Sequence, residues 1–126
     1  MKKVIIGAVC LLLLAGCGEN KEKSAYKQIS QGEAMEIMAK ESDYVIVDVR
    51  TEEEYSSGHI PTAICIPNET IDETVSEILT DKQQMILVYC RSGNRSKQAS
   101  QKLADLGYIN VLEFGGINTW EGDIEK

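Results

Sequence analysis

The chain has 126 residues, of which 43% are hydrophobic and 26% are charged, so it can form one ordinary globular domain and is too short for two. Its formal net charge of −7 argues against nucleic acid as a partner and against electrostatic adhesion to anionic lipid. Acidic surfaces are common among soluble domains, so the charge by itself indicates no substrate.

Residues 1–16 have the pattern of a secretory signal peptide. Two lysines after Met1 precede an apolar stretch, residues 4–15, which is too short to span a bilayer permanently. The alternative interpretation of this stretch is a buried apolar helix. Leu14-Ala15-Gly16-Cys17 resembles the bacterial lipobox, which implies cleavage before Cys17 and acylation of that cysteine by a diacylglyceryl group and palmitate.

Residues 17–25 comprise the lipidated cysteine and a short polar, charged segment without periodicity, which predicts a flexible tether. A diacylglyceryl group supplies two acyl chains, the number usually needed for stable anchoring. We therefore expect residues 26–126 to form an extracytoplasmic domain that is held at the cell membrane by the lipid on Cys17.

Strand and helix patterns alternate in the first half of this domain. The predicted strands are residues 26–29, 44–47 and 63–66, the last stopped by Pro67. Capping boxes predict two helix starts. The first box runs from Ser30 to Glu33 and opens a helix that buries Ala34, Met35, Ile37 and Met38; the second runs from Thr51 to Glu54 and opens a short helix that ends at Gly58.

The second half continues the alternation. It contains a helix from Thr70 with an apolar stripe of Ile71, Val75, Ile78 and Leu79, a strand at 85–88, a helix from Ser96 to Leu106 capped by Gly107, a strand whose core is 111–112, and a short helix carrying Trp120 after the turn at Gly115-Gly116. This order predicts an α/β fold with a central parallel five-stranded sheet and helices on both faces. Functional residues of such sheets gather at the carboxyl ends of strands, where Asp48 and Cys90 both fall.

The segment after the strand at 85–88 is the strongest candidate for a reactive site. Cys90 ends the apolar run and stands directly before a helical pattern, where unpaired amides and the helix dipole favour negative charge. Gly93 and Asn94 tolerate left-handed torsions, which lets the loop curl into an anion-binding nest. Two arginines in the loop add fixed positive charge. The pattern predicts a nucleophilic thiolate at Cys90, with Arg91, Ser92, Gly93, Asn94, Arg95 and Ser96 as the substrate-binding loop. The alternative is a small, inert, buried cysteine.

Three groups of residues carry a resemblance to a known family. Tyr89-Cys90-Arg91-Ser92-Gly93-Asn94-Arg95-Ser96 is similar to the active-site loop of rhodanese-type sulfurtransferases. The upstream signature of that domain is resembled by Asp48-Val49-Arg50, Glu54-Tyr55, Gly58-His59-Ile60-Pro61 and Ala63-Ile64, and its C-terminal portion by Leu106-Gly107-Tyr108, Asn110-Val111, Gly115-Gly116-Ile117 and Trp120. The resemblance covers nearly all of residues 26–126 and implies a rhodanese-like fold.

The resemblance also implies a two-step sulfur transfer. The Cys90 thiolate would attack the sulfane sulfur of thiosulfate or a similar anionic donor, and the resulting persulfide would pass its sulfur to cyanide or a thiol. No cofactor is implied, and the sequence has no Cys-x-x-Cys pair or histidine cluster that would support a metal site.

Two other functions stay open. A phosphatase or arsenate reductase also uses a cysteine and an arginine in an anion-binding loop, but that pattern places five residues between them, whereas four separate Cys90 from Arg95. The other alternative is a persulfide carrier or binding module without turnover of its own.

The remaining polar candidates have two interpretations each. Asp48, Arg50 and Glu54 are interpreted as a salt-bridge network that supports the loop, with an acid–base set as the alternative. Ser96 either donates its hydroxyl to the sulfur or caps the helix, and either arginine of the loop neutralises the departing oxyanion. His59 is predicted to be a hydrogen-bonded turn residue, Tyr89 and Trp120 to be packing residues, and Cys65 to be an unpaired strand residue that does not form a disulfide with Cys90.

Overall fold

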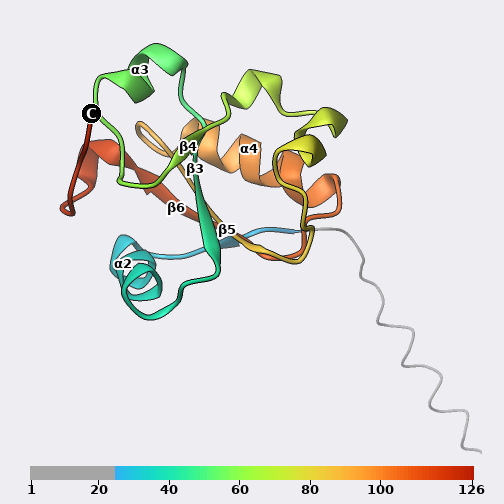
Figure 1. The fold of residues 1–126 in the computed structure, drawn as a ribbon, viewed down its shortest axis with the longest axis horizontal. Helices are drawn as coiled ribbons and strands as arrows, with labels where there is room; N and C mark the ends of the chain where they lie inside the picture. Colours follow the sequence, from blue (N-terminus) through green and yellow to red (C-terminus); the bar gives the residue numbers. More distant parts are fainter. Residues whose placement is uncertain (1–24) are drawn as a thin grey trace, which may run out of the picture.

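The computed structural model describes residues 25–126. The predicted signal peptide, the lipidation site at Cys17 and the tether up to residue 24 lie outside the described residues (Figure 1). Within residues 25–126, no helix has the length and apolar character that crossing a membrane requires.

Five parallel strands form a single sheet in the order β2-β6-β5-β3-β4 (Figure 1). The strands are β2 Lys27–Gln28, β3 Tyr44–Asp48, β4 Ile64–Cys65, β5 Met85–Cys90 and β6 Val111–Gly116. The predicted central parallel five-stranded sheet is confirmed. Because β5 lies between β6 and β3, its carboxyl end sits in the middle of the sheet edge, and this end carries Cys90.

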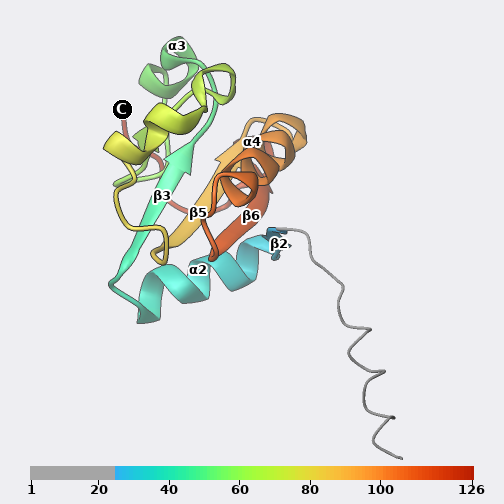
Figure 2. The same ribbon diagram turned by 90° about the vertical axis from the view of Figure 1, so that its right-hand side faces the viewer.

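Helices cover both faces of the sheet, as predicted (Figure 2). The α-helices are α2 Gln31–Lys40, α3 Glu52–Ser56 and α4 Asn94–Asp105, and the 3-10 helices are η1 Asn68–Thr70, η2 Glu73–Glu77 and η3 Ile117–Thr119. Both predicted capping boxes are present, at the starts of α2 and α3. In each box a hydroxyl accepts from a backbone amide three residues on while the glutamate there accepts from the cap amide, so the first turn is satisfied locally.

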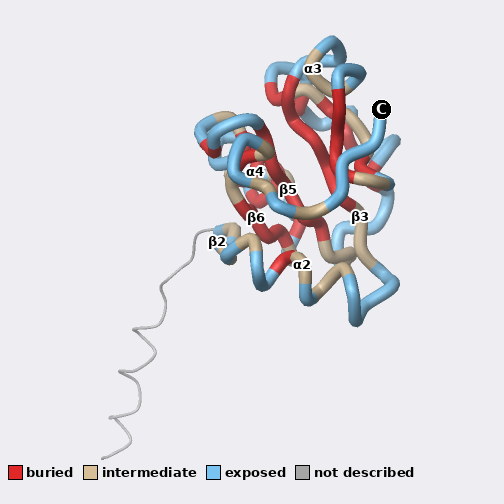
Figure 3. Tube along the Cα trace, turned by 90° about the vertical axis from the view of Figure 1, so that its left-hand side faces the viewer, coloured by how far each residue is buried: buried red, intermediate tan, exposed pale blue. Residues whose placement is uncertain are grey.

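Alternation along β5 divides the core into two layers. Ile86, Val88 and Cys90 pack in the cluster that includes α4, whereas Leu87 and Tyr89 pack in the cluster that includes α2. All five of these residues are buried, and the central strands form the most buried part of residues 25–126 (Figure 3). The pleat therefore aims the Cys90 side chain toward α4 and sends Tyr89 to the opposite face.

The prediction of one continuous helix from Thr70 is wrong. The segment folds as the two short 3-10 helices η1 and η2. The side chain of Asp72 caps the start of η2. Ile71, Val75 and Leu79 are buried as predicted, but Ile78 is 59% exposed. The reason is that η2 ends at Glu77, so Ile78 lies beyond the helix and turns toward solvent.

Several predicted boundaries and roles also change. α4 begins at Asn94 instead of Ser96, so Asn94 is helical, and Gly93 alone in the loop has a left-handed φ. β6 runs from its predicted core at 111–112 on to Gly116, so Gly115 and Gly116 lie in the strand instead of turning the chain, and Trp120 follows η3 instead of lying in it.

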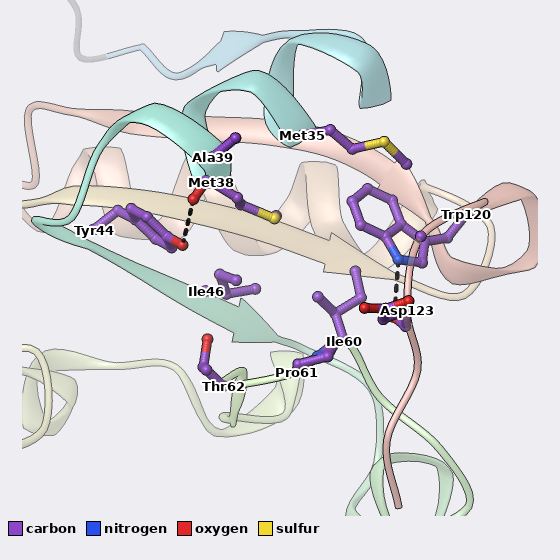
Figure 4. Close-up of a pocket in the computed structure, with 11 residues that line it drawn as sticks. Met35, Met38, Ala39, Tyr44, Ile46, Ile60, Pro61, Thr62, Trp120 and Asp123 are labelled. Atoms are coloured by element: carbon purple, nitrogen blue, oxygen red, sulfur yellow. Dashed lines mark hydrogen bonds between the residues drawn. The ribbon is translucent and has the colours of Figure 1, made fainter.

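Met35 and Met38 are half-buried and are not part of a sealed core. With Ile46, Ile60 and Trp120 they line an apolar cavity of about 380 Å³ between α2 and the turn after Ile60 (Figure 4).

Candidate active site

The sulfur of Cys90 lies at the centre of the loop that joins β5 to α4. The residue is 1% exposed, and the backbone N–H of Gly93 donates to its Sγ at 3.0 Å. Gly93 reaches this position with a φ of +109°, a conformation that favours glycine, and it is also the N-cap residue of α4. The loop therefore directs an amide and the start of a helix at one sulfur, which stabilises a thiolate.

Ser96 connects the sulfur to a buried carboxylate. Its Oγ lies 3.4 Å from Cys90 Sγ and 3.0 Å from the carbonyl oxygen of Gly93, and it donates to Oε2 of Glu113 at 2.5 Å. Because Gly93 is the N-cap of α4, the predicted alternative in which Ser96 caps the helix is wrong. Ser96 instead lies against the sulfur, but as an acceptor: Cys90 Sγ donates to Ser96 Oγ, and the Ser96 hydroxyl is directed to Glu113 and not, as in the other predicted alternative, to the sulfur.

Glu113 was missed by the sequence analysis. It is 2% exposed and lies on β6, where its Oε2 also accepts from the amide of Gly115 at 3.0 Å. The Nε2 of Gln28 on β2 donates to its Oε1 at 3.3 Å. One sequence signal was present: Glu113 is a charged residue inside the apolar run from Val111 to Phe114. A carboxylate in a central strand requires a buried partner.

Gly116 packs directly against the backbone of the Cys90 loop. It pairs with Cys90 in the register of β5 and β6, and a Cβ added there would lie 2.0 Å from the carbonyl oxygen of Arg91. The same carbonyl accepts from the amide of Asn118 at 3.1 Å. The backbone of the loop thus rests directly on the end of β6, and a side chain at Gly116 would displace it.

The two arginines of the loop have different surroundings. Arg95 forms two hydrogen bonds with Glu54 of α3, at 2.8 and 3.1 Å. Its guanidinium lowers the pKa of Glu54 to about 2. Arg91 is exposed and forms no ion pair with another described residue. The ion pair neutralises one arginine at the edge of the loop and leaves the other at its exposed side.

Asp48 and Arg50 form a buried pair beside the loop. Arg50 Nη2 donates to Asp48 Oδ2 at 2.6 Å and to the carbonyl oxygen of Gly58 at 2.7 Å. The hydroxyl of Tyr89 donates to Asp48 Oδ2 at 2.7 Å and accepts from the amide of Ile60 at 3.1 Å. These contacts tie β3, β5 and the 58–60 segment together, which is the arrangement of a supporting network.

Tyr89, predicted only as a packing residue, is part of this network. Its burial, followed by its hydrogen bond to Asp48, raises the pKa of its phenol. Tyr89 therefore stays a donor toward Asp48 throughout the working pH range.

The other predicted candidates lie outside the sulfur's immediate surroundings. Cys65 and Cys90 are both free thiols, and burial raises the pKa of Cys65 to about 11, followed by the charge of Asp48. His59 stacks on Tyr55 with ring centroids 3.8 Å apart, and its Nδ1 lies 2.9 Å from the carbonyl oxygen of Tyr55. The hydrogen bond of His59 agrees with its prediction as a turn residue.

A buried cysteine at the end of a central parallel strand, with a loop amide on its sulfur and a helix behind it, is a site for nucleophilic chemistry at sulfur. A family model described as rhodanese-like domain matches residues 30–123. The chain therefore belongs to the rhodanese-like family.

Relatives named for an enzymatic activity support this assignment. The thiosulfate sulfurtransferase GlpE of Coxiella burnetii is 37% identical over 97 residues, which are 76% of this chain and 88% of that relative. The thiosulfate sulfurtransferase PspE of Escherichia coli K12 is 37% identical over 71 residues, 56% of this chain and 68% of that relative. A solved structure described as a rhodanese with anions from E. coli aligns with a TM-score of 0.62 at 32% identity, over 66% of this chain and 98% of that one.

Proposed function

We propose that this protein is a sulfurtransferase that carries a sulfane sulfur from thiosulfate or a similar anionic donor, through a persulfide on Cys90, to cyanide or a thiol acceptor. The observation that carries the proposal is the Gly93 amide, which donates to a buried sulfur at the end of β5. Relatives named thiosulfate sulfurtransferases support the choice of donor.

The reaction has two displacement steps at sulfur. In the first, the Cys90 thiolate forms a bond to the outer sulfur of thiosulfate, and the electron pair of the broken S–S bond leaves on sulfite. In the second, cyanide or a thiolate takes the outer sulfur of the persulfide and returns the thiolate of Cys90. Both sulfur anions would lie against the N–H of Gly93 and the N-terminus of α4, where negative charge is favoured.

Arg91 is the arginine we assign to donor recognition. Its guanidinium is exposed beside the loop, whereas that of Arg95 is already held by Glu54. Arg91→Ala should raise the KM for thiosulfate by about tenfold and leave kcat nearly unchanged, because the contact acts before the sulfur is transferred. Lys97→Ala, which removes an exposed charge from α4, is the matched control. An equal rise in KM for both variants would contradict a specific contact.

The decisive test is the intact mass of the full chain, wild type and Cys90→Ala, after thiosulfate and again after cyanide. Wild type should gain one sulfur, about 32 Da, and lose it to cyanide with release of thiocyanate, whereas Cys90→Ala should gain nothing. A wild-type chain that gains no sulfur and hydrolyses an aryl phosphate would overturn the proposal in favour of a phosphatase. A persulfide that forms but is discharged only by one particular thiol would favour the carrier.

We also propose that the protein is exported and lipid-anchored through Cys17. This proposal is supported by the lipobox-like Leu14-Ala15-Gly16-Cys17 alone. Metabolic labelling with palmitate should modify the wild-type chain and not Cys17→Ala, and the mature N-terminus should begin at residue 17. Recovery of an unmodified, uncleaved chain from the producing cells would contradict the anchor.

A further inference from the structure

Glu113 is a buried carboxylate held by neutral donors. Ser96 Oγ, the amide of Gly115 and the amide group of Gln28 donate to it at 2.5, 3.0 and 3.3 Å. Within residues 25–126 it forms no ion pair. A negative charge in this position is costly without a cation, and the shortest of its contacts leads through one hydroxyl to the sulfur of Cys90.

The direction of the Ser96 hydroxyl proton determines whether the thiol or the thiolate of Cys90 is favoured. Ser96 donates that proton to Glu113 Oε2 at 2.5 Å, so its oxygen presents a lone pair toward Cys90 Sγ, 3.4 Å away. A thiol can donate to this lone pair, but a thiolate is repelled by it. An ionised Glu113 therefore favours the protonated form of Cys90.

We infer that Cys90 and Glu113 form a coupled acid pair, joined by Ser96, in which one negative charge is exchanged between the sulfur and the carboxylate. When the thiolate forms, the S–H bond of Cys90 breaks as its proton passes to Ser96 Oγ, and the former hydroxyl proton of Ser96 passes to Glu113 Oε2. The carboxylate becomes a carboxyl group, the thiol becomes a thiolate, and nothing is oxidised or reduced.

After this exchange every donor fits its acceptor. The new hydroxyl proton of Ser96 points to the thiolate, and the protonated Glu113 donates to Ser96 Oγ. Glu113 is thus a positioning residue that acts through Ser96, and its negative charge opposes the loss of the Cys90 proton. This inference rests on the proposed role of Cys90 as the nucleophile.

Arg91, next to Cys90 in the loop, is exposed and forms no ion pair with another described residue, whereas two other charged groups near the pair have partners of their own. On α4, Arg95 is paired with Glu54 of α3. Across β5, Asp48 is paired with Arg50. Glu113 is the acid that the Cys90 proton can reach through a single hydroxyl.

The test is the pH dependence with which iodoacetamide alkylates Cys90 in the full chain. Trypsin places Cys90 on the peptide 83–91 and Cys65 on the peptide 51–82, so mass spectrometry measures the two rates separately. In Glu113→Gln, the alkylation curve should move to lower pH by about one unit, so that Cys90 reacts about tenfold faster below the wild-type midpoint. Glu121→Gln, at an exposed position, should leave the curve unchanged.

Two outcomes would overturn the inference: identical curves for wild type and Glu113→Gln, or slower alkylation in the variant. Alkylation needs neither a sulfur donor nor an acceptor, so this result is independent of whether the chain transfers sulfur. If the wild-type chain gains no sulfur but the alkylation curve of Glu113→Gln shifts as expected, the proposed function is contradicted and the acid pair is not. If Cys90 gains sulfur but the alkylation curves of wild type and Glu113→Gln are identical, the acid pair is contradicted and the proposed function is not.

A second measurement uses the wild-type chain and does not depend on the folding of any variant. With ¹³C-labelled glutamate, the side-chain carboxyl signal of Glu113 should move across the same pH range in which Cys90 becomes reactive. Blocking Cys90 with iodoacetamide should remove that step, because the modified sulfur no longer exchanges a proton. A Glu113 signal that ignores the state of Cys90 would overturn the coupling.

Discussion

Gly116→Ala tests whether the end of β6 holds the Cys90 loop in its working position. A Cβ at Gly116 would lie 2.0 Å from the carbonyl oxygen of Arg91, 2.5 Å from its carbonyl carbon and 2.7 Å from Cα of Ser92. Ordinary van der Waals contact begins at 3.4 Å. Gly116 has an extended φ of −130°, which alanine adopts freely, so the effect of the substitution is steric.

The loop backbone must retreat by about 1 Å or more to admit the methyl group, and a displacement of this size costs on the order of 100-fold in rate. We expect kcat/KM for thiocyanate formation from thiosulfate and cyanide to fall by about that factor, or about 2.7 kcal/mol of transition-state stabilisation. The free energy of unfolding should fall by about 1 to 3 kcal/mol, because the contact is overpacked.

Gly32→Ala is the matched control, because its added Cβ meets Ser30 Oγ at 3.8 Å and nothing closer. It should leave kcat/KM unchanged and stabilise α2 by up to about 1 kcal/mol. Initial rates and urea unfolding of both variants provide the comparison. A folded Gly116→Ala chain with wild-type kcat/KM would refute the claim that β6 positions the loop.

The ion pair, the second cysteine and one strained turn each carry a prediction. Glu54→Gln should lower the free energy of unfolding by about 1 kcal/mol at neutral pH, because Arg95 lowers the pKa of Glu54 to about 2 from 4.5. A lowered carboxyl pKa stabilises the fold above pH 4.5, so the difference between the chains in urea unfolding should vanish as the pH falls toward 2; a difference that persists there would contradict the assignment. At about pH 8, iodoacetamide should modify Cys90 and spare Cys65, whose pKa is raised to about 11 by burial, and equal modification in peptide maps would contradict this. Thr62 is β-branched with a φ of +71°, so Thr62→Gly should raise the free energy of unfolding by about 0.5 to 1 kcal/mol, whereas Thr80→Gly should not.

Features encoded within a few residues were predictable from the sequence. Both capping boxes place donor and acceptor three residues apart. The helix starts at Ser30 and Thr51 could therefore be predicted from the local sequence without any knowledge of the fold. The Cys90 loop was predictable for the same reason, since its strand, glycine and helix start are contiguous. The 3-10 helices after Pro67 were not, because the side chain of Asp72 and the end of η2 decide their course against the apolar periodicity.

Contacts that depend on strand register could not be read from the sequence. Glu113 is 17 residues from Ser96 along the chain and meets it because β5 and β6 are neighbours with a shift in register. The contact of Gly116 with the backbone of Arg91 arises in the same way. The sequence was sufficient to predict a cysteine in an anion-binding loop. The contacts of Glu113 and Gly116 with that loop could be identified only from the pairing of β5 with β6.

Asp48 and Glu113 are the two most buried carboxylates of the described chain. Their different partners explain why Asp48 has a supporting role whereas Glu113 exchanges a proton. Asp48, fully buried, is met by the guanidinium of Arg50 at 2.6 Å and by the hydroxyl of Tyr89. Protonating it would break an ion pair that joins three segments, so its charge is fixed. Glu113 is almost as buried, yet it is met by neutral donors, and its shortest contact is a hydroxyl that also touches the reactive sulfur. Protonating it breaks no ion pair, which is the property that a proton acceptor beside a nucleophile requires.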